Sequence, residues 1–382
     1  MEVQIFMNSR MEPQRFVLPS RPNRYLEIDL AKFVAIISMI VNHAYEVFAY
    51  REFLKSPGCE NPVLYTLNFI IAFLGGVPAA PVFMFCMGLG ITFSKNPNQS
   101  KLMKRGVQLL LVGLLVNFII QILPIFWEAP SFDKILGTIP GLFANDVYFF
   151  FGLTFFFFAF VFTVKKPVLI CCIVGALSLI GGFFLPYIDF DTGNTALNLV
   201  LGLFVHTDEY SYFSIASWII FPIAGYLFGK VLSKEDSKAK FYKFSAVICA
   251  GILALTTVMG LSYGYKNSML NPLGAAEKYY IPNFFSQLWG VAFVIIWIAL
   301  CYLITGKMKD GRFKNLVIWG SKNIMPIYVL QWLTIVLMKP VLELSADIFF
   351  TCVICAVITV MTFCITKLYL YLKAKMRKTK IT

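Results

Sequence analysis

The stretch Leu30-Ala-Lys-Phe-Val-Ala-Ile-Ile-Ser-Met-Ile-Val-Asn-His43 is mostly apolar but carries a lysine near its start and a histidine at its end. On an α-helix Lys32 and His43 are about three turns apart, which puts both on one face with roughly 16 Å between them along the axis. That distance is about half the hydrocarbon thickness of a bilayer. Ionisable groups at such depth are costly and usually face a protein interior or a wet cavity. The stretch therefore predicts a membrane helix that carries a functional site.

The composition of the whole chain assigns it to the membrane. Of its 382 residues, 59% are hydrophobic and only 14% are charged, far from the balance of a soluble domain. We therefore expect an all-α, polytopic integral membrane protein with about ten transmembrane helices. The apolar windows that predict these helices lie near residues 30–49, 70–93, 106–127, 147–163, 167–186, 214–232, 243–264, 284–305, 323–338 and 346–370.

The second of these windows contains helix breakers. Its apolar run begins near Val63 and includes Gly75, Gly76, Pro78 and Pro81. Helix breakers at membrane depth are tolerated only where neighbouring helices or a cavity satisfy the freed backbone groups. We therefore expect an interfacial or broken helix at this point, next to a pocket lined by protein.

Lysine and arginine alternate between rich and poor loops along the chain. Most of the 33 Lys and Arg residues lie in the N-terminal segment, in loops 94–105, 230–243 and 307–322, and at the C-terminal end, whereas loop 187–213 has none. The positive-inside rule then places both termini in the cytoplasm. This topology also explains the net charge of +13, so we expect no nucleic-acid partner.

Three segments follow from this topology. We predict a cytoplasmic N-terminal segment at 1–29, a transmembrane domain at 30–372 and a basic cytoplasmic tail at 373–382. Because residues 1–29 lack the apolar core of a signal peptide, we expect the first span to act as its own insertion signal. The expected location is the plasma or inner membrane, where lipids surround a multi-pass protein.

The remaining cysteine and histidine residues give no disulfide or metal pattern. Of nine cysteines, Cys59 is alone in the first outer loop, while Cys352 and Cys355 have a CxxC spacing inside an apolar helix. Cysteines within apolar helices are typical small buried side chains, so we predict neither a metal site nor a disulfide framework. His206, the second of two histidines, lies in a polar stretch and is expected in a solvated loop.

The opening of the chain resembles that of membrane-bound acyltransferases. The segment from Arg24 through Asp29 and Lys32 to His43 is similar to the start of the acyltransferase type 3 family and of the related heparan-α-glucosaminide N-acetyltransferase-like family. Both begin with an Ile/Leu-Asp-x-x-Arg segment followed by a histidine at the far end of helix one. Four later segments resemble the family in the same order: Ala80-Pro-Val-Phe-Met-Phe-Cys-Met-Gly88, Leu102-Met-Lys-Arg-Gly106, Ser217-Trp-Ile-Ile-Phe-Pro-Ile-Ala-Gly-Tyr-Leu-Phe-Gly-Lys230 and Gly320-Ser-Lys-Asn-Ile-Met-Pro-Ile-Tyr328-Val-Leu-Gln331.

Two positions depart from the pattern that the resemblance implies. The first-helix arginine of the family is Lys32 here, which keeps the charge but lacks the bidentate fork of a guanidinium. The late histidine is Gln331, which can form hydrogen bonds but cannot shuttle a proton near neutral pH. The acid–base chemistry that the resemblance implies is therefore concentrated on His43.

The side chains themselves support acyl transfer. Imidazole can take a proton from an acceptor hydroxyl or amine, or can carry the acyl group, so His43 is the first catalytic candidate. Asp146 and Glu46 are candidates for orienting or activating it. The alternatives are structural: His43 can form a hydrogen bond that packs helices together, with Asn42 as part of the same polar patch, and Asp146 can cap the helix that follows it or mark its boundary.

Four cations are candidates for binding the phosphates of acetyl-CoA. Lys101, Lys104 and Arg105 precede the third span, and Lys32 lies deeper, so together they predict a basic funnel on the cytoplasmic side. The alternatives are that Lys32 extends to the headgroups or pairs with Asp29, and that the other three only determine topology.

The sequence thus favours a membrane acyltransferase that moves an acetyl group from cytoplasmic acetyl-CoA to a hydroxyl or amine of an extracytoplasmic, carbohydrate-type acceptor. The leading alternative is a transporter that uses Lys32 and His43 as a substrate or proton site. A third possibility is a non-catalytic membrane subunit. The acceptor, the acyl chain and the oligomeric state are not encoded in any pattern that we find.

Overall fold

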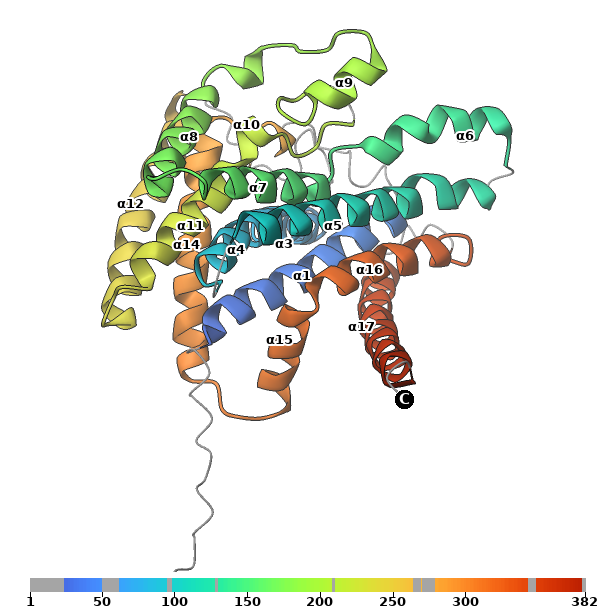
Figure 1. Cartoon of the computed structure of the whole chain (residues 1–382). Coiled ribbons are helices and arrows are strands. Elements are labelled where there is room, and N and C mark those ends of the chain that lie inside the picture. The colour runs from blue at the N-terminus through green and yellow to red at the C-terminus, as the bar shows by residue number, and fades with distance from the viewer. Residues whose placement is uncertain are drawn as a thin grey trace, which may run out of the picture.

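The protein was analysed as a computed structural model, shown in Figure 1. In the described part of the chain every regular element is helical, and nine helical stretches are long and apolar enough to cross a membrane. The predicted all-α, polytopic architecture is therefore confirmed. The residues that the structure describes are 24–49, 62–94, 98–127, 130–207, 210–263, 269, 279–342 and 348–379.

The helices follow the predicted windows with few shifts. Those of the first half are α1 (Leu26–Phe48), α3 (Pro62–Gly76), α4 (Ala80–Thr92), α5 (Gln99–Asn117), α6 (Phe132–Thr138), α7 (Val147–Val161), α8 (Pro167–Gly181) and α9 (Thr195–Leu201). Those of the second half are α10 (Ile215–Trp218), α11 (Ile220–Leu232), α12 (Lys238–Tyr263), α14 (Phe284–Gly306), α15 (Arg312–Lys322), α16 (Ile324–Met338) and α17 (Ile348–Thr379).

The tenth predicted span is the shortest. The window at 323–338 forms α16, whose 15 residues fall below the roughly 20 that a straight helix needs to cross the hydrocarbon. The window at 346–370 forms the longer α17, which continues through the boundary predicted at 372. Residues 1–23 of the predicted N-terminal segment lie outside the described residues.

Helix α1 occupies the middle of the bundle. It contacts α3, α4, α14, α15, α16 and α17. In its most apolar window 67% of the residues are buried, against 17% in α12 at the periphery. A helix that is enclosed by protein on most sides can hold polar side chains away from lipid, which is the requirement that Lys32 and His43 impose.

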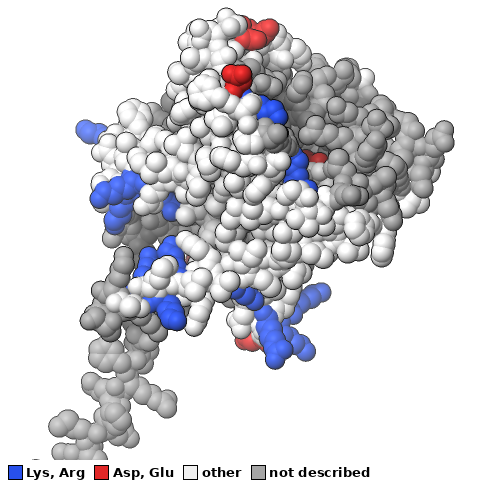
Figure 2. Space-filling model, turned by 90° about the vertical axis from the view of Figure 1, so that its right-hand side faces the viewer, with Lys and Arg blue, Asp and Glu red and all other residues white. Residues whose placement is uncertain are grey.

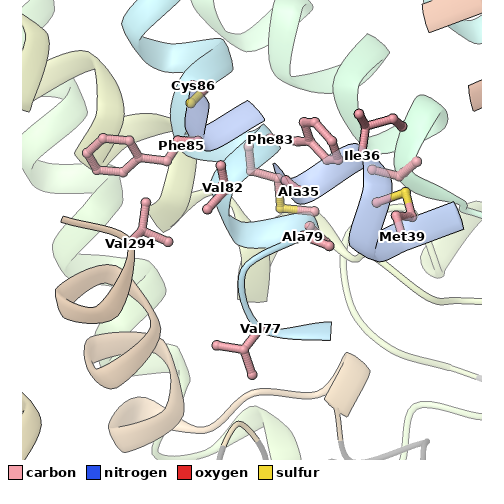
Figure 3. Close-up of a cluster of buried hydrophobic side chains, with 14 of the residues drawn as sticks. Ala35, Ile36, Met39, Val77, Ala79, Val82, Phe83, Phe85, Cys86 and Val294 are labelled. Carbon is pink, nitrogen blue, oxygen red and sulfur yellow. The ribbon is translucent and has the colours of Figure 1, made fainter. Parts of the chain in front are cut away.

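Small residues allow α4 to approach both its neighbours closely. A methyl group added at Gly88 of α4 would lie 1.9 Å from the carbonyl oxygen of Pro222, and one at Gly225 of α11 would lie 1.9 Å from that of Phe85. The two helices therefore cross backbone against backbone, as small residues permit in membrane bundles. On its other side α4 packs on α1, and Figure 3 shows Ala35 and Phe83 in that buried cluster.

The loops predicted to share a side of the membrane lie together in space. Helices α6 and α9 stand at the upper end of the molecule, whereas α15 and the C-terminus lie at the lower end (Figure 1). Lys and Arg side chains are most numerous toward the lower end in Figure 2. This arrangement is the one that the positive-inside rule requires, and the sidedness itself stays a prediction.

Candidate active site

A cavity of about 290 Å³ lies beside the second half of α1. Its wall is built by α1, the junction of α3 and α4, the π-helical turn that follows α5, the start of α7 and α16. The residues that carry polar groups into it include His43, Glu46, Asp146, Tyr280, Tyr328 and Trp332. Three of these, His43, Glu46 and Asp146, are the catalytic candidates from the sequence, and the structure brings them to one cavity.

The broken second span forms part of this wall, as the sequence predicted. Helix α3 ends at Gly76, α4 begins at Ala80, and both residues line the cavity together with Gly75. A methyl group at Gly75 would lie 2.2 Å from the Cβ of Asn42, so α3 presses directly on α1 one residue before His43. The carbonyl of Gly76, freed at the break, accepts a hydrogen bond of 2.8 Å from the hydroxyl of Tyr279. The cavity therefore exists because the helix breaks here and its backbone is satisfied by neighbours.

His43 is held by residues of α16. The side-chain amide nitrogen of Gln331 lies 3.0 Å from Nδ1 of His43. The imidazole stacks on Trp332 with ring centroids 4.4 Å apart, and the ring of Tyr328 meets it edge-on at 6.2 Å. Two ring contacts and one polar contact fix the plane of the imidazole, which leaves Nε2 as the nitrogen that no protein contact in the described residues occupies.

The two carboxylates approach His43 in different ways. Asp146 occupies the N-cap position of α7 but makes no side-chain capping hydrogen bond; its Oδ2 accepts one of 3.3 Å from the hydroxyl of Tyr328. Asp146 is thus linked to His43 through Tyr328. Glu46 lies one turn beyond His43 on α1, keeps an exposed side chain, and accepts a hydrogen bond of 2.8 Å from Asn42. Asp146 therefore holds the helix-boundary position that the sequence offered as an alternative, and its carboxylate also contacts Tyr328.

Several residues of the cavity were not singled out from the sequence. Tyr280 and Tyr279 precede α14, and burial raises the pKa of both phenols, with the carboxylates of Glu46 and Asp146 adding to the effect on Tyr280. Both phenols therefore stay protonated and can donate hydrogen bonds. The amide of Asn117 bridges the carbonyls of Leu142 and Ala144 at 3.0 Å and fixes the loop before α7. A polar residue inside an apolar helix is the signal that could have pointed to Asn117.

Lys32 lies at the other end of α1, in an ion-pair network. Its Nζ is 3.8 Å from Oδ1 of Asp29, the partner that the sequence offered as an alternative. Asp29 is 5% exposed and also forms an ion pair with Arg24 and accepts a hydrogen bond of 2.5 Å from Ser321 on α15. The structure therefore gives Lys32 a structural partner and does not bring it to the cavity around His43.

The other three cations are exposed at the beginning of α5. Lys101, Lys104 and Arg105 occupy the first two turns of the helix, which starts with the side chain of Asn98 accepting a hydrogen bond from the backbone of Lys101. Arg105 reaches α16, with a guanidinium nitrogen 4.0 Å from the sulfur of Met325. In the described residues none of these three side chains forms an ion pair with a carboxylate, and the funnel that they would form with Lys32 stays a prediction.

The remaining predictions concern residues outside the cavity. His206 lies in the loop after α9, where its Nδ1 is 2.6 Å from the carbonyl oxygen of Ser211, so it braces the loop. The eight cysteines that the structure describes are all unpaired, while Cys59 lies outside the described residues.

Comparison with known families gives one match. The family model described as an acyltransferase domain, that of acyltransferase type 3, matches residues 25–368 and thus most of the chain. No curated protein matches the chain significantly. The matched range includes every helix of the cavity and both ends of α1. Of the two families that the sequence resembles, this finding supports the first.

Proposed function

The chain belongs to the acyltransferase type 3 family and is a multi-pass membrane acyltransferase, and on that premise we propose which groups it exchanges. Its donor would be acetyl-CoA from the cytoplasm, and its acceptor a hydroxyl or amine of an extracytoplasmic carbohydrate, at the plasma or inner membrane. The observation that carries the proposal is the position of His43, which faces a polar cavity inside an apolar bundle. A membrane protein has no need of such a cavity for packing alone.

The beginning of α5 suits the phosphates of a coenzyme A thioester. A helix N-terminus attracts anions through its free backbone N–H groups, and Lys101, Lys104 and Arg105 add three exposed cations to it. Because Arg105 contacts α16, a donor bound there would lie against the helix that holds His43. Lys32 supports the proposal less, since Asp29 already neutralises it.

The cavity suits a sugar as acceptor. Carbohydrates present hydroxyl groups around an apolar ring face, and recognition therefore combines aromatic surfaces with hydrogen-bonding groups. Trp332 supplies an aromatic ring, the phenol of Tyr280 supplies a donor, and Glu46 supplies an acceptor. A volume of about 290 Å³ fits one sugar unit or the reacting end of a longer chain.

In this proposal His43 acts as a general base. It takes the proton of the acceptor hydroxyl at Nε2 while the acceptor oxygen forms a bond to the acetyl carbon. The donor supplies the acetyl group as a thioester, whose carbon–sulfur bond breaks. His43 then returns the proton to the departing sulfur, so the products are an acetyl ester and a free thiol, and the imidazole is regenerated. Asp146 acts through Tyr328 to keep the imidazole in place.

The test uses purified protein in sealed vesicles with an acceptor glycan inside and radiolabelled acetyl-CoA added to the face that carries the termini. We expect label on the enclosed glycan with wild-type protein, without any ion gradient, and none with His43→Gln. Glutamine keeps hydrogen bonding and approximate volume but cannot accept the proton. Labelled donor that enters the vesicles only when a gradient is imposed, with no label on the glycan, would favour the transporter, and equal label on the glycan with His43→Gln would contradict the role of His43.

A further inference from the structure

The side-chain amide of Gln331 contacts the imidazole of His43 through its nitrogen, whereas its oxygen has no hydrogen-bond donor in the described residues. The residue is 0% exposed, and its Nε2 lies 3.0 Å from Nδ1 of His43. Its amide oxygen Oε1 is buried and accepts no hydrogen bond from the described residues. A buried carbonyl without a donor is unfavourable, so this oxygen needs an explanation.

The orientation of this amide decides which nitrogen of His43 carries the proton. When Nε2 of Gln331 donates to Nδ1, Nδ1 must be the unprotonated nitrogen, and the ring proton resides on Nε2. An imidazole in that state cannot accept a proton at Nε2. The oxygen and nitrogen of a carboxamide have nearly the same shape, so a half-turn of the amide exchanges them. After that half-turn Oε1 accepts a hydrogen bond from Nδ1–H, and Nε2 of His43 is free to act as a base.

We propose that Gln331 is the positioning residue that selects the Nδ1–H tautomer of His43 through its amide oxygen. This inference rests on the proposed function, because it assigns the partner of the proposed base. The oxygen serves both states of the reaction, since Nδ1 keeps its proton when His43 becomes an imidazolium. If the amide nitrogen faced Nδ1 instead, two N–H donors would point at each other and no hydrogen bond could form. The half-turn gives Oε1 a donor at Nδ1 and moves the amide nitrogen to the position where Oε1 had no partner in the described residues.

A neutral partner for the imidazole has a consequence for pH. The titratable groups that line the cavity with His43 are Glu46 on α1, Asp146 at the start of α7, Tyr212 before α10, Tyr279 and Tyr280 before α14, and Tyr328 on α16. Gln331 adds no charge to this set. A carboxylate at position 331 would keep the accepting oxygen but would stabilise the imidazolium, so the base would stay protonated to higher pH.

The first test observes the tautomer directly. The chain has only two histidines, so a ¹⁵N spectrum of histidine-labelled protein contains two sets of ring signals, and a His206→Gln variant assigns them. In wild-type protein at a pH where His43 is neutral, we expect a protonated Nδ1 and an unprotonated Nε2. A protonated Nε2 would overturn the proposal, whether or not the protein transfers acetyl groups.

The second test compares Gln331→Met with Gln331→Glu. Methionine keeps the length and removes both polar atoms, so we expect kcat to fall about 10- to 100-fold with KM for acetyl-CoA unchanged, which is less than the loss of the base itself. Glutamate keeps the oxygen, so we expect a kcat within about threefold of wild type at its optimum and an acid limb of the pH–rate profile moved to higher pH. Unchanged kcat in Gln331→Met, or a loss in Gln331→Glu as large as in Gln331→Met, would overturn the proposal.

Gln287 provides a matched control. It is also 0% exposed, its Nε2 donates to the carbonyl of Ser217 at 2.8 Å, and its Oε1 likewise lacks a donor in the described residues. It does not line the cavity. Gln287→Met should lower stability while kcat per folded molecule stays at the wild-type value. If wild-type protein transfers no acetyl group at all, the proposed function fails, whereas the tautomer measurement still decides the role of Gln331.

Discussion

The two ends of α1 hold polar side chains in opposite ways. At the N-terminal end the carboxylates of Glu27 and Asp29 are almost fully buried, and each has charged partners. Asp29 pairs with Arg24 and Lys32, while Glu27 pairs with Lys238 at 3.9 Å. Glu27 also accepts a hydrogen bond of 3.0 Å from the hydroxyl of Tyr242 on α12. Glu27 thus connects α1 to α12, and Asp29 connects it to α15 through Ser321, whereas Lys32 pairs within α1.

At the C-terminal end of α1 the polar groups contact protein on one side and face the cavity on the other. His43 is fixed by Gln331 and two aromatic rings but presents an unoccupied nitrogen, and Glu46 and Asp146 face the same cavity. Polar groups whose partners are complete stabilise a fold, whereas groups that are positioned but incomplete remain available to a ligand. The same helix therefore anchors the bundle at one end and offers chemistry at the other.

The largest effect that we predict is on the rate of acyl transfer in His43→Gln. Removing a general base costs about 10²–10⁴-fold in rate, while glutamine preserves much of the packing against Trp332. The initial rate per folded molecule at saturating acetyl-CoA measures this effect. A rate within about threefold of wild type would mean that His43 packs rather than reacts.

The second prediction concerns Asp29→Asn at the other end. This change leaves Arg24 and Lys32 without their counter-ion, so we expect the free energy of unfolding to fall by about 1.5–3 kcal/mol, the range for hydrogen bonds to charged groups. The thermal midpoint of the purified protein measures it. Asp310→Asn is the control, because that carboxylate is 92% exposed in its pair with Lys314 and should matter little.

The third prediction separates the two groups of cations. In Arg105→Gln we expect KM for acetyl-CoA to rise about three- to tenfold with kcat unchanged, as loss of uniform binding does. In Lys32→Gln we expect KM to change less than about twofold, because Asp29 already neutralises this lysine. Steady-state kinetics at several salt concentrations measures both. An equal increase of KM in both variants would mean that Lys32 also binds the donor.

The smallest effect distinguishes the two carboxylates of the cavity. Asp146→Asn disturbs the contact with Tyr328, so we expect kcat to fall about three- to tenfold. Glu46→Gln changes a side chain whose hydrogen bond is to Asn42 and not to a residue that holds His43, so we expect a change of about threefold or less. Comparison of kcat for the two variants measures the difference. A larger loss in Glu46→Gln would make Glu46 the partner of His43.

Much of this comparison could be predicted from the sequence, because membrane burial leaves strong local signals. The apolar windows predicted the helices. The helix breakers Gly75, Gly76, Pro78 and Pro81 predicted the broken span and the pocket beside it. The sequence also allowed Lys32 to pair with Asp29 instead of binding the donor, because residues one turn apart on a helix can contact each other.

The rest depended on contacts between distant segments. Gln331 lies 288 residues from His43, and no local pattern tells which face of α16 meets α1. The positions of Tyr280 and Asp146 at the cavity follow from how loops end, which periodicity does not encode. The apolar composition of α16 predicted a full membrane span, although its 15 residues are few for that role.

The most direct test of the account measures two quantities in two variants: the transfer rate per folded molecule and the thermal midpoint, in His43→Gln and in Asp29→Asn. The account predicts a crossed result. In His43→Gln the transfer rate should fall while the thermal midpoint stays at the wild-type value. In Asp29→Asn the thermal midpoint should fall while the transfer rate per folded molecule stays at the wild-type value. Parallel losses of both quantities in both variants, or the reverse assignment, would contradict the division of α1 into an anchoring end and a reactive end.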